Sequence, residues 1–348
     1  MKPRSILAIP AILVVALSIS AAGPEAGDSP VDHLPPYITQ LTTFGERPDW
    51  SHDGKKILFM SKTFGDAMEI DLATKAIRNL TADYPHYGYT RALYLANGDI
   101  LLTGPESFDP QNTDKARRHC YLFVLDKSLT KPAVPLGALC SEGPAISRKR
   151  MHIAWTQWSE SSNETPPTNS TIFEADIVYE NGIPRLADQK TVIDRHALPF
   201  PCTIETQNFR PPDEKELTFS AYNPPGTESD VCSVDLATRK VTNYTKSPND
   251  YDEVEGISPD GQYALIECDK QNHQGPGHID LWRLKFDGSE YKRLTFFSDY
   301  PGYKASNPVV SDDGRFFAFQ MGMSRNAAGV GHGLFIYDIE KAEKEKIP

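Results

Sequence analysis

The residues best able to do chemistry in this 348-residue chain are histidines and carboxylates that stand before, or in loops close to, repeated Asp-Gly turns. A histidine transfers protons near neutral pH or ligates a metal, and a carboxylate acts as a general acid or base. An arginine or asparagine beside them would orient a substrate or neutralise its charge. The candidate catalytic residues are His86, Arg91, Glu205, Asn208, Glu255, His278 and His332.

Glycine-rich segments hold two of these histidines, in Gln274-Gly-Pro-Gly-His278 and Gly329-Val-Gly-His332-Gly. Glycine and proline at this density predict exposed turns, so both imidazoles are expected at a loop rim, where they could transfer protons or bind a metal. The alternative is that such a histidine only hydrogen-bonds a neighbouring loop.

His86 is singled out by the repetition of one loop. Asp83-Tyr-Pro-His-Tyr87 and Asp299-Tyr-Pro-Gly-Tyr303 differ at one position, where His86 stands for glycine. The shared aromatic residues predict packing between structural units. His86, the residue that differs, is therefore expected to have a functional role.

A second polar set occupies equivalent positions and is expected to bind substrate. One acidic residue in a loop is usually just solvated, but polar groups from several units that meet at one face indicate a binding funnel. The same residue types leave a divalent metal open as a cofactor. The candidate binding residues are Glu142, Glu253, Tyr303, Lys304 and Asn307.

A repeat positions these residues. Ser51-His-Asp-Gly54, Ser258-Pro-Asp-Gly261 and Ser311-Asp-Asp-Gly314 each precede an apolar run, which predicts a hairpin. A third strand ending in an acid follows, and a Leu-Thr tail closes several units, as at Leu80-Thr81 and Leu294-Thr295. Units of about 50 to 55 residues with four short strands predict β-propeller blades. We count six.

The predicted fold is therefore all-β, a six-bladed β-propeller of four-stranded blades in one domain at 38–348, after a linker at 23–37. Gln40-Leu-Thr-Thr-Phe44 resembles the tails but precedes the first unit. It is expected to add the outer strand of the last blade, beside Lys344–Ile347, and so to close the ring. A β-sandwich with a second domain would not explain six similar units without a linker.

The hairpin Trp50-Ser-His-Asp-Gly-Lys-Lys-Ile-Leu-Phe59, with Asp71-Leu-Ala-Thr and the Leu-Thr tails, resembles the PD40 (WD40-like) repeats of TolB-like six-bladed β-propellers. The resemblance covers essentially the whole chain after residue 22 and is strongest in units one, five and six. It implies a partner-binding protein or an enzyme such as an oligogalacturonate lyase. Prolyl peptidases carry similar blades but also need a hydrolase domain with Gly-x-Ser-x-Gly, a motif this sequence lacks.

Residues 1–22 predict a secretory signal peptide, because a basic start precedes an apolar run from Ile6 to Ile19 and small residues follow. An uncleaved anchor is the alternative, but the run is short for a bilayer and contains Pro10. The protein is therefore expected outside the cell, or in the periplasm of a bacterial host. Four sequons are then candidate glycosylation sites: Asn79, Asn163, Asn169 and Asn243.

The five cysteines show no metal-ligand spacing. In an oxidising compartment they allow up to two disulfides, with Cys120–Cys140 as the first candidate, or all five are small buried residues. The net charge of −11 argues against a nucleic-acid partner. No later segment resembles a membrane span, and a monomer is expected.

Acids, bases and histidines on one predicted face favour an enzyme that acts on a small polar or carbohydrate substrate. A lyase or hydrolase with histidine and carboxylate acid–base chemistry fits this set. The alternatives are a TolB-like binding module for a protein, and a glycan-binding protein that stacks sugars on tyrosines.

Overall fold

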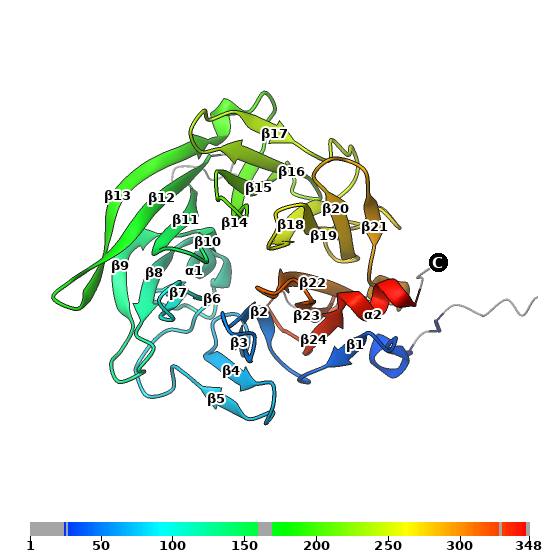
Figure 1. The fold of residues 1–348 in the computed structure, drawn as a ribbon, viewed down its shortest axis with the longest axis horizontal. Coiled ribbons are helices and arrows are strands. Elements are labelled where there is room, and N and C mark those ends of the chain that lie inside the picture. The colour runs from blue at the N-terminus through cyan, green and yellow to red at the C-terminus, as the bar shows by residue number, and fades with distance from the viewer. Residues whose placement is uncertain (1–23, 26, 159–168, 327–328, 346–348) are drawn as a thin grey trace, which may run out of the picture.

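The computed structural model describes residues 24–25, 27–158, 169–326 and 329–345. These residues form six four-stranded antiparallel sheets arranged as a ring (Figure 1), so the chain is a six-bladed β-propeller. The predicted signal segment and the Asn163 sequon lie outside the described residues. No helix in the described ranges is long and apolar enough to cross a membrane.

Each blade runs outward from an inner strand at the channel. Blade one contains β2 (Glu46–Trp50), β3 (Lys56–Met60), β4 (Ala67–Asp71) and β5 (Ile77–Asn79). Blade two contains β6 (Arg91–Tyr94), β7 (Ile100–Pro105), β8 (Cys120–Leu125) and β9 (Val134–Leu139). Blade three contains β10 (Glu142–Ile146), β11 (His152–Trp158), β12 (Ser170–Glu180) and β13 (Ile183–Asp194).

The other three blades repeat this order. Blade four contains β14 (Thr203–Phe209), β15 (Glu216–Asn223), β16 (Glu228–Asp235) and β17 (Val241–Asn243). Blade five contains β18 (Asp252–Ile257), β19 (Tyr263–Cys268), β20 (Asp280–Lys285) and β21 (Tyr291–Arg293). Blade six contains β22 (Tyr303–Val310), β23 (Phe316–Met323), β24 (Leu334–Asp338) and β1 (Ile38–Gln40). Short helices are η1 (Pro30–His33), α1 (Thr113–Arg118), η2 (Arg195–Ala197), η3 (Phe297–Asp299) and α2 (Ile339–Lys344).

The Ser-x-Asp-Gly segments form the turns between the first and second strands. Ser51 Oγ donates to Asp53 at 2.8 Å and accepts from the Lys56 amide at 3.0 Å, and Ser311 makes the equivalent contacts in blade six. Gly54 lies at φ +68°, a left-handed conformation that glycine adopts without strain. The repeated motif thus encodes one repeated hairpin.

The Leu-Thr tails fasten the outer strands. Thr295 Oγ1 donates to the buried carboxylate of Asp280 at 2.7 Å and accepts from the Leu281 amide at 2.9 Å. Thr81 makes the matching contacts to Asp66 and the Ala67 amide in blade one. The threonine therefore links the fourth strand to the start of the third.

The sixth sheet takes its outer strand from the N-terminal end of the chain. β1 pairs antiparallel with β24, with Ile38 opposite Tyr337. Thr42 Oγ1 accepts from the Leu334 amide at 3.0 Å, the contact that Thr81 and Thr295 make elsewhere. The prediction that this strand lies beside Lys344–Ile347 is wrong at Lys344. That residue ends the helix α2, and β1 pairs with β24 instead.

Apolar residues form six clusters, each between two neighbouring sheets. Leu265 and Leu281 of blade five pack with Phe317 and Phe335 of blade six. Trp50 of blade one packs with residues of blade six, so the cluster where the ring closes resembles the others. Each blade is therefore covered on both faces by its neighbours.

The cysteines and sequons occupy different environments. All five cysteines are buried, and the Cys140 amide donates to the Cys120 carbonyl at 2.8 Å. Their disulfide stays a prediction. Asn79 is exposed, whereas Asn243 Nδ2 donates to Asp230 at 2.8 Å and Asn169 Oδ1 lies 3.1 Å from His196 Nε2.

Thr42→Val tests the ring closure. Removing the hydroxyl leaves the buried Leu334 amide without its acceptor, and we expect the free energy of unfolding to fall by about 1 to 3 kcal/mol. Urea unfolding measures the change. Thr39→Val, at an exposed position of β1, is the control and should have little effect. Equal small effects of the two changes would contradict this role of Thr42.

Candidate functional site

Two cavities lie along the channel, each lined by residues of all six blades. The larger has a volume of about 500 Å³ and lies where the inner strands begin and the second strands end. The smaller, of about 320 Å³, lies toward the hairpin turns. Arg91, Glu255 and Asn307 line both cavities. Glu255 lies 3.7 Å from the Arg91 guanidinium and accepts from Asn307 Nδ2 at 2.7 Å, so these three side chains separate the chambers.

Bulges shape the channel. The pairing register shifts within the inner strands β2, β10, β14, β18 and β22 at equivalent positions. A bulge adds an unpaired residue and redirects side chains, and bulges are frequent beside active sites. Arg47 and Asn307 lie at two of the bulges with left-handed φ values of 52° and 49°. The bulges thus place long polar side chains at the narrow part of the channel.

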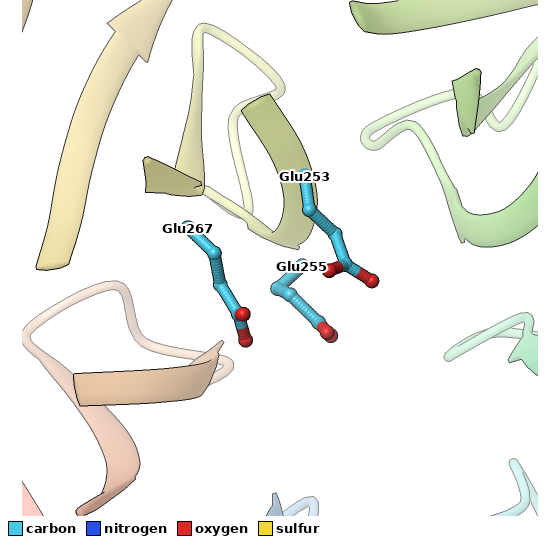
Figure 2. A group of neighbouring side chains, drawn as sticks. All are labelled: Glu253, Glu255 and Glu267. Carbon is cyan, nitrogen blue, oxygen red and sulfur yellow. The ribbon is translucent and has the colours of Figure 1, made fainter. Parts of the chain in front are cut away.

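Three glutamates of blade five converge there (Figure 2). Glu253 and Glu255 lie on β18, and Glu267 lies on β19 directly opposite Glu253. One oxygen from each carboxyl group lies within 4.8 Å of the others. Three ionised carboxylates so close would repel one another strongly, so their protonation must be unequal.

Hydrogen-bond donors surround Glu253. It accepts from Tyr222 Oη at 2.6 Å, from Gln207 Nε2 at 3.3 Å and from Tyr251 Oη. Burial, and then nearby carboxylates, raise the pKa of both tyrosines well above 10, so both remain neutral donors. Several donors on one carboxylate stabilise its ionised form, which is the form a general base needs.

The other two carboxyl groups retain protons more readily. Burial is the main cause that raises the pKa of Glu267 to about 8, and the charge of Glu253 adds to the shift. Burial also raises the pKa of Glu255 well above its ordinary value, although Arg91 opposes the shift. The cluster therefore places a carboxyl group that accepts several hydrogen bonds beside two carboxyl groups with raised pKa values, and such a contrast in environment is typical of an acid–base pair.

The same three glutamates are the described residues that could surround a metal ion, and oxygen ligands suit a hard cation such as Mg²⁺ or Ca²⁺. The chain already supplies positive charge there, because Arg91 faces Glu255 and the charge of Lys304 acts on Glu267. The structure thus supplies cationic groups beside the glutamates, and we treat the cluster as an acid–base centre.

Six residues singled out from the sequence meet at the larger cavity: Arg91, Glu205, Glu253, Glu255, Lys304 and Asn307. Asn208 lines the smaller cavity, where its Nδ2 donates to the Glu255 carbonyl at 2.7 Å. The Tyr303 ring lies 6.0 Å from the Arg325 guanidinium at the start of β22. The side chain of Glu142 lies outside the described residues.

The three candidate histidines are not among the residues that line either cavity. His86 Nδ1 accepts from the Gly88 amide at 2.9 Å, so Nε2 carries the proton and donates to Asp66 at 3.1 Å. Both nitrogens are engaged between blades one and two, as in a structural histidine.

The other two histidines lie in the loops between second and third strands. His332 Nε2 lies 2.7 Å from Asn326 Nδ2, and burial with the charge of Arg325 lowers the pKa of His332. Among the described residues, the buried Nδ1 of His278 has no hydrogen-bond partner. Its neighbours Pro276 and Gly277 line the larger cavity, so this loop contributes backbone to the site.

Sequence reasoning missed Glu267, Tyr222 and Gln320, which lie on second strands. Gln320 Oε1 accepts from the Arg47 amide at 2.5 Å, within the same cavity. A signal exists, because Glu267 is the one acidic residue of Tyr263-Ala-Leu-Ile-Glu-Cys268. A polar residue within an otherwise apolar second strand indicates a side chain directed at the channel.

No protein-family model and no curated protein sequence matches the chain. Solved structures with the same architecture include a Mycobacterium tuberculosis puromycin-hydrolyzing peptidase, with TM-score 0.50, 14% identity and coverage of 80% of this chain and 40% of the peptidase. A gluconolactonase from Xanthomonas campestris gives TM-score 0.52 and 12% identity over 86% of this chain and 88% of its own. TolB from Acinetobacter baumannii gives TM-score 0.45 and 16% identity over 87% of this chain and 65% of its own. The likenesses to the peptidase and the gluconolactonase show a shared propeller fold.

The raised pKa of Glu267 predicts a pH-dependent stability. A carboxyl group with a higher pKa in the folded protein contributes stability below its ordinary pKa of 4.5, and this contribution is lost as pH rises through about 8. Glu267→Gln mimics the neutral acid and should flatten the dependence. Denaturant unfolding between these pH values tests this, with exposed Glu106→Gln as control. An unchanged slope in Glu267→Gln would contradict the assignment.

Proposed function

We propose that the protein is an acid–base enzyme that cleaves a carbon–oxygen bond of a small, oxygen-rich molecule bound in the larger cavity. The observation that carries the proposal is the position of Glu253, which accepts hydrogen bonds from Tyr222, Gln207 and Tyr251, directly opposite Glu267, whose pKa burial raises to about 8. A cavity of about 500 Å³ matches the size of ordinary small-molecule sites.

The spacing of the carboxyl groups favours one geometry. Their oxygens lie within 4.8 Å of each other, whereas inverting hydrolysis needs about 6.5 to 9.5 Å to hold a water on the opposite side of a sugar ring. A neighbouring acid and base suit a reaction in which proton removal and protonation occur on one side of the substrate. Elimination meets this condition, so we favour a lyase over an inverting hydrolase.

In this elimination Glu253 removes a proton from the carbon next to a carboxylate. The electron pair of that C–H bond forms a C=C bond, and the adjacent C–O bond breaks with its electrons moving to oxygen. Glu267 gives its proton to this oxygen, so the products are an unsaturated acid and an alcohol. Exchange with water then restores a proton to Glu267 and removes one from Glu253. Positioned proton transfer of this kind contributes about 10² to 10⁴-fold.

The proposal includes secretion, because the N-terminal pattern is that of a signal segment. A TolB-like binding module is the alternative role. A module of that kind would bind its partner without turnover and would tolerate the loss of Glu267.

Glu253→Gln and Glu267→Gln are each expected to lower turnover about 10² to 10⁴-fold, because each removes one proton-transfer group. Oligouronates, glycosides and sugar lactones form the substrate panel, and ultraviolet absorbance of the new C=C bond separates elimination from hydrolysis. Glu106→Gln is the matched control on an exposed loop. No turnover of any compound by the wild-type protein, or full activity in Glu267→Gln, would sink the proposal.

Removal of divalent metal should leave the activity unchanged, because the proposed reaction uses the glutamates themselves as acid and base and Arg91 already faces Glu255. The measurement compares initial rates before and after dialysis against EDTA, and again after Mg²⁺, Ca²⁺ or Mn²⁺ is added back. Loss of activity with EDTA and its recovery with one cation would show that the cluster is a metal site instead.

A further inference from the structure

The ammonium group of Lys304 lines the larger cavity and forms no ion pair with the described residues. Its Nζ donates to the Pro276 carbonyl at 2.9 Å. In the part of the chain that the structure describes, no carboxylate lies within the ion-pair distance of 4.0 Å from this ammonium group. Because an ammonium carries three N–H donors, two remain for other acceptors.

Ser306 lies two residues further along β22, so its side chain leaves the same face of the strand and also lines the larger cavity. The residue is only 3% exposed, and its Oγ has no hydrogen-bond partner among the described residues. A buried polar group without a partner costs about 1 to 3 kcal/mol. An acceptor atom of a bound molecule would remove that cost.

Gly322 fixes the path of the lysine stem. It lies opposite Lys304 on β23, and a Cβ at this position would be 3.0 Å from Lys304 Cε and 3.2 Å from Cγ. The absence of a side chain therefore lets the stem cross the neighbouring strand. Lys304 is thus held in position at the cavity.

Charged side chains of both signs line the larger cavity. The cationic side chains are Arg47, Arg91, Arg117 and Lys304, and the acidic ones are Glu46, Glu205, Glu253, Glu255 and Glu267. Groups of the protein already engage two of these acids, because Arg91 lies 3.7 Å from Glu255 and two tyrosines donate to Glu253. The Lys304 ammonium keeps two N–H donors for an anionic group of a ligand.

We propose that Lys304 and Ser306 bind a carboxylate group of the substrate. The inference rests on the proposed function, because elimination removes a proton next to a carboxylate whose charge must be neutralised. The two residues adjoin the acid, since the amide of Asn307, the residue after Ser306, donates to Glu267 at 2.5 Å. The substrate class is thus a small hydroxylated carboxylic acid or its ether.

Calorimetric titration with glucuronate and glucose tests the assignment, because the two probes differ only in the carboxylate. Wild-type protein should bind glucuronate more tightly. Lys304→Met should weaken glucuronate about 10- to 100-fold, as expected for a hydrogen bond to a charged group, and leave glucose unchanged. Ser306→Ala should weaken it less. Lys240→Met, at an exposed lysine, is the matched control.

Gly322→Ala keeps both binding groups but displaces the lysine stem, and should also weaken glucuronate selectively. Unfolding midpoints show that each variant is folded. Equal affinity of the wild type for glucuronate and glucose, or an unchanged ratio in Lys304→Met, would overturn the proposal. Tighter binding of inorganic phosphate than of glucuronate would overturn the carboxylate assignment.

The two proposals fail separately. Lys304-dependent binding of glucuronate without turnover of any panel compound would support the carboxylate site and reject the proposed reaction. Glu267-dependent cleavage of neutral substrates at full rate in Lys304→Met would support the acid–base pair and reject the carboxylate site.

Discussion

The structure depends on the need of each blade to be covered on both of its faces. A four-stranded sheet with two apolar faces cannot shield itself from water, and only a closed ring gives every blade two neighbours. The cluster around Trp50 joins blades one and six, and Thr42 ties the N-terminal strand to Leu334. Closure makes the six inner strands converge, so the residues at their bulges meet at one channel.

The channel in turn imposes an electrostatic constraint. Carboxyl groups removed from water and placed close together cannot all ionise. Tyr222 and Tyr251 donate hydrogen bonds to Glu253, and the Arg91 guanidinium lies 3.7 Å from Glu255. Burial, and then the charge of Glu253, raise the pKa of Glu267 to about 8. The same forces that permit this polar centre also create an acid beside a base.

The repeat made the fold predictable from the sequence, because the Ser-x-Asp-Gly turns and Leu-Thr tails make the same local hydrogen bonds in blades one, five and six. Glu253, Glu255 and Lys304 could be placed near the channel because they precede such turns. Glu267 could not, since its position follows from pairing with Glu253 across two strands. The bulges that direct Arg47 and Asn307 also depend on the pairing of the inner strand with the second strand, and this pairing cannot be read from the amino-acid composition.

Residue type did not predict the positions of the three candidate histidines, which do not line either channel cavity. His86 has the right chemistry for proton transfer, but its two nitrogens are engaged by Gly88 and Asp66. The N-terminal strand was expected beside Lys344, but Lys344 ends the helix α2, because Asp338 caps this helix by accepting from the Lys341 amide at 3.0 Å. Both outcomes depend on hydrogen bonds that spacing alone does not reveal.

The central claim is that the channel holds neutral carboxylic acids beside an ionised carboxylate at neutral pH. Infrared spectroscopy of protein labelled with ¹³C at the glutamate carboxyl groups observes these states directly. The account predicts a carboxylic-acid band at neutral pH in the wild type that is lost in the Glu255→Gln, Glu267→Gln double variant. A wild-type spectrum at neutral pH with carboxylate bands alone would contradict it.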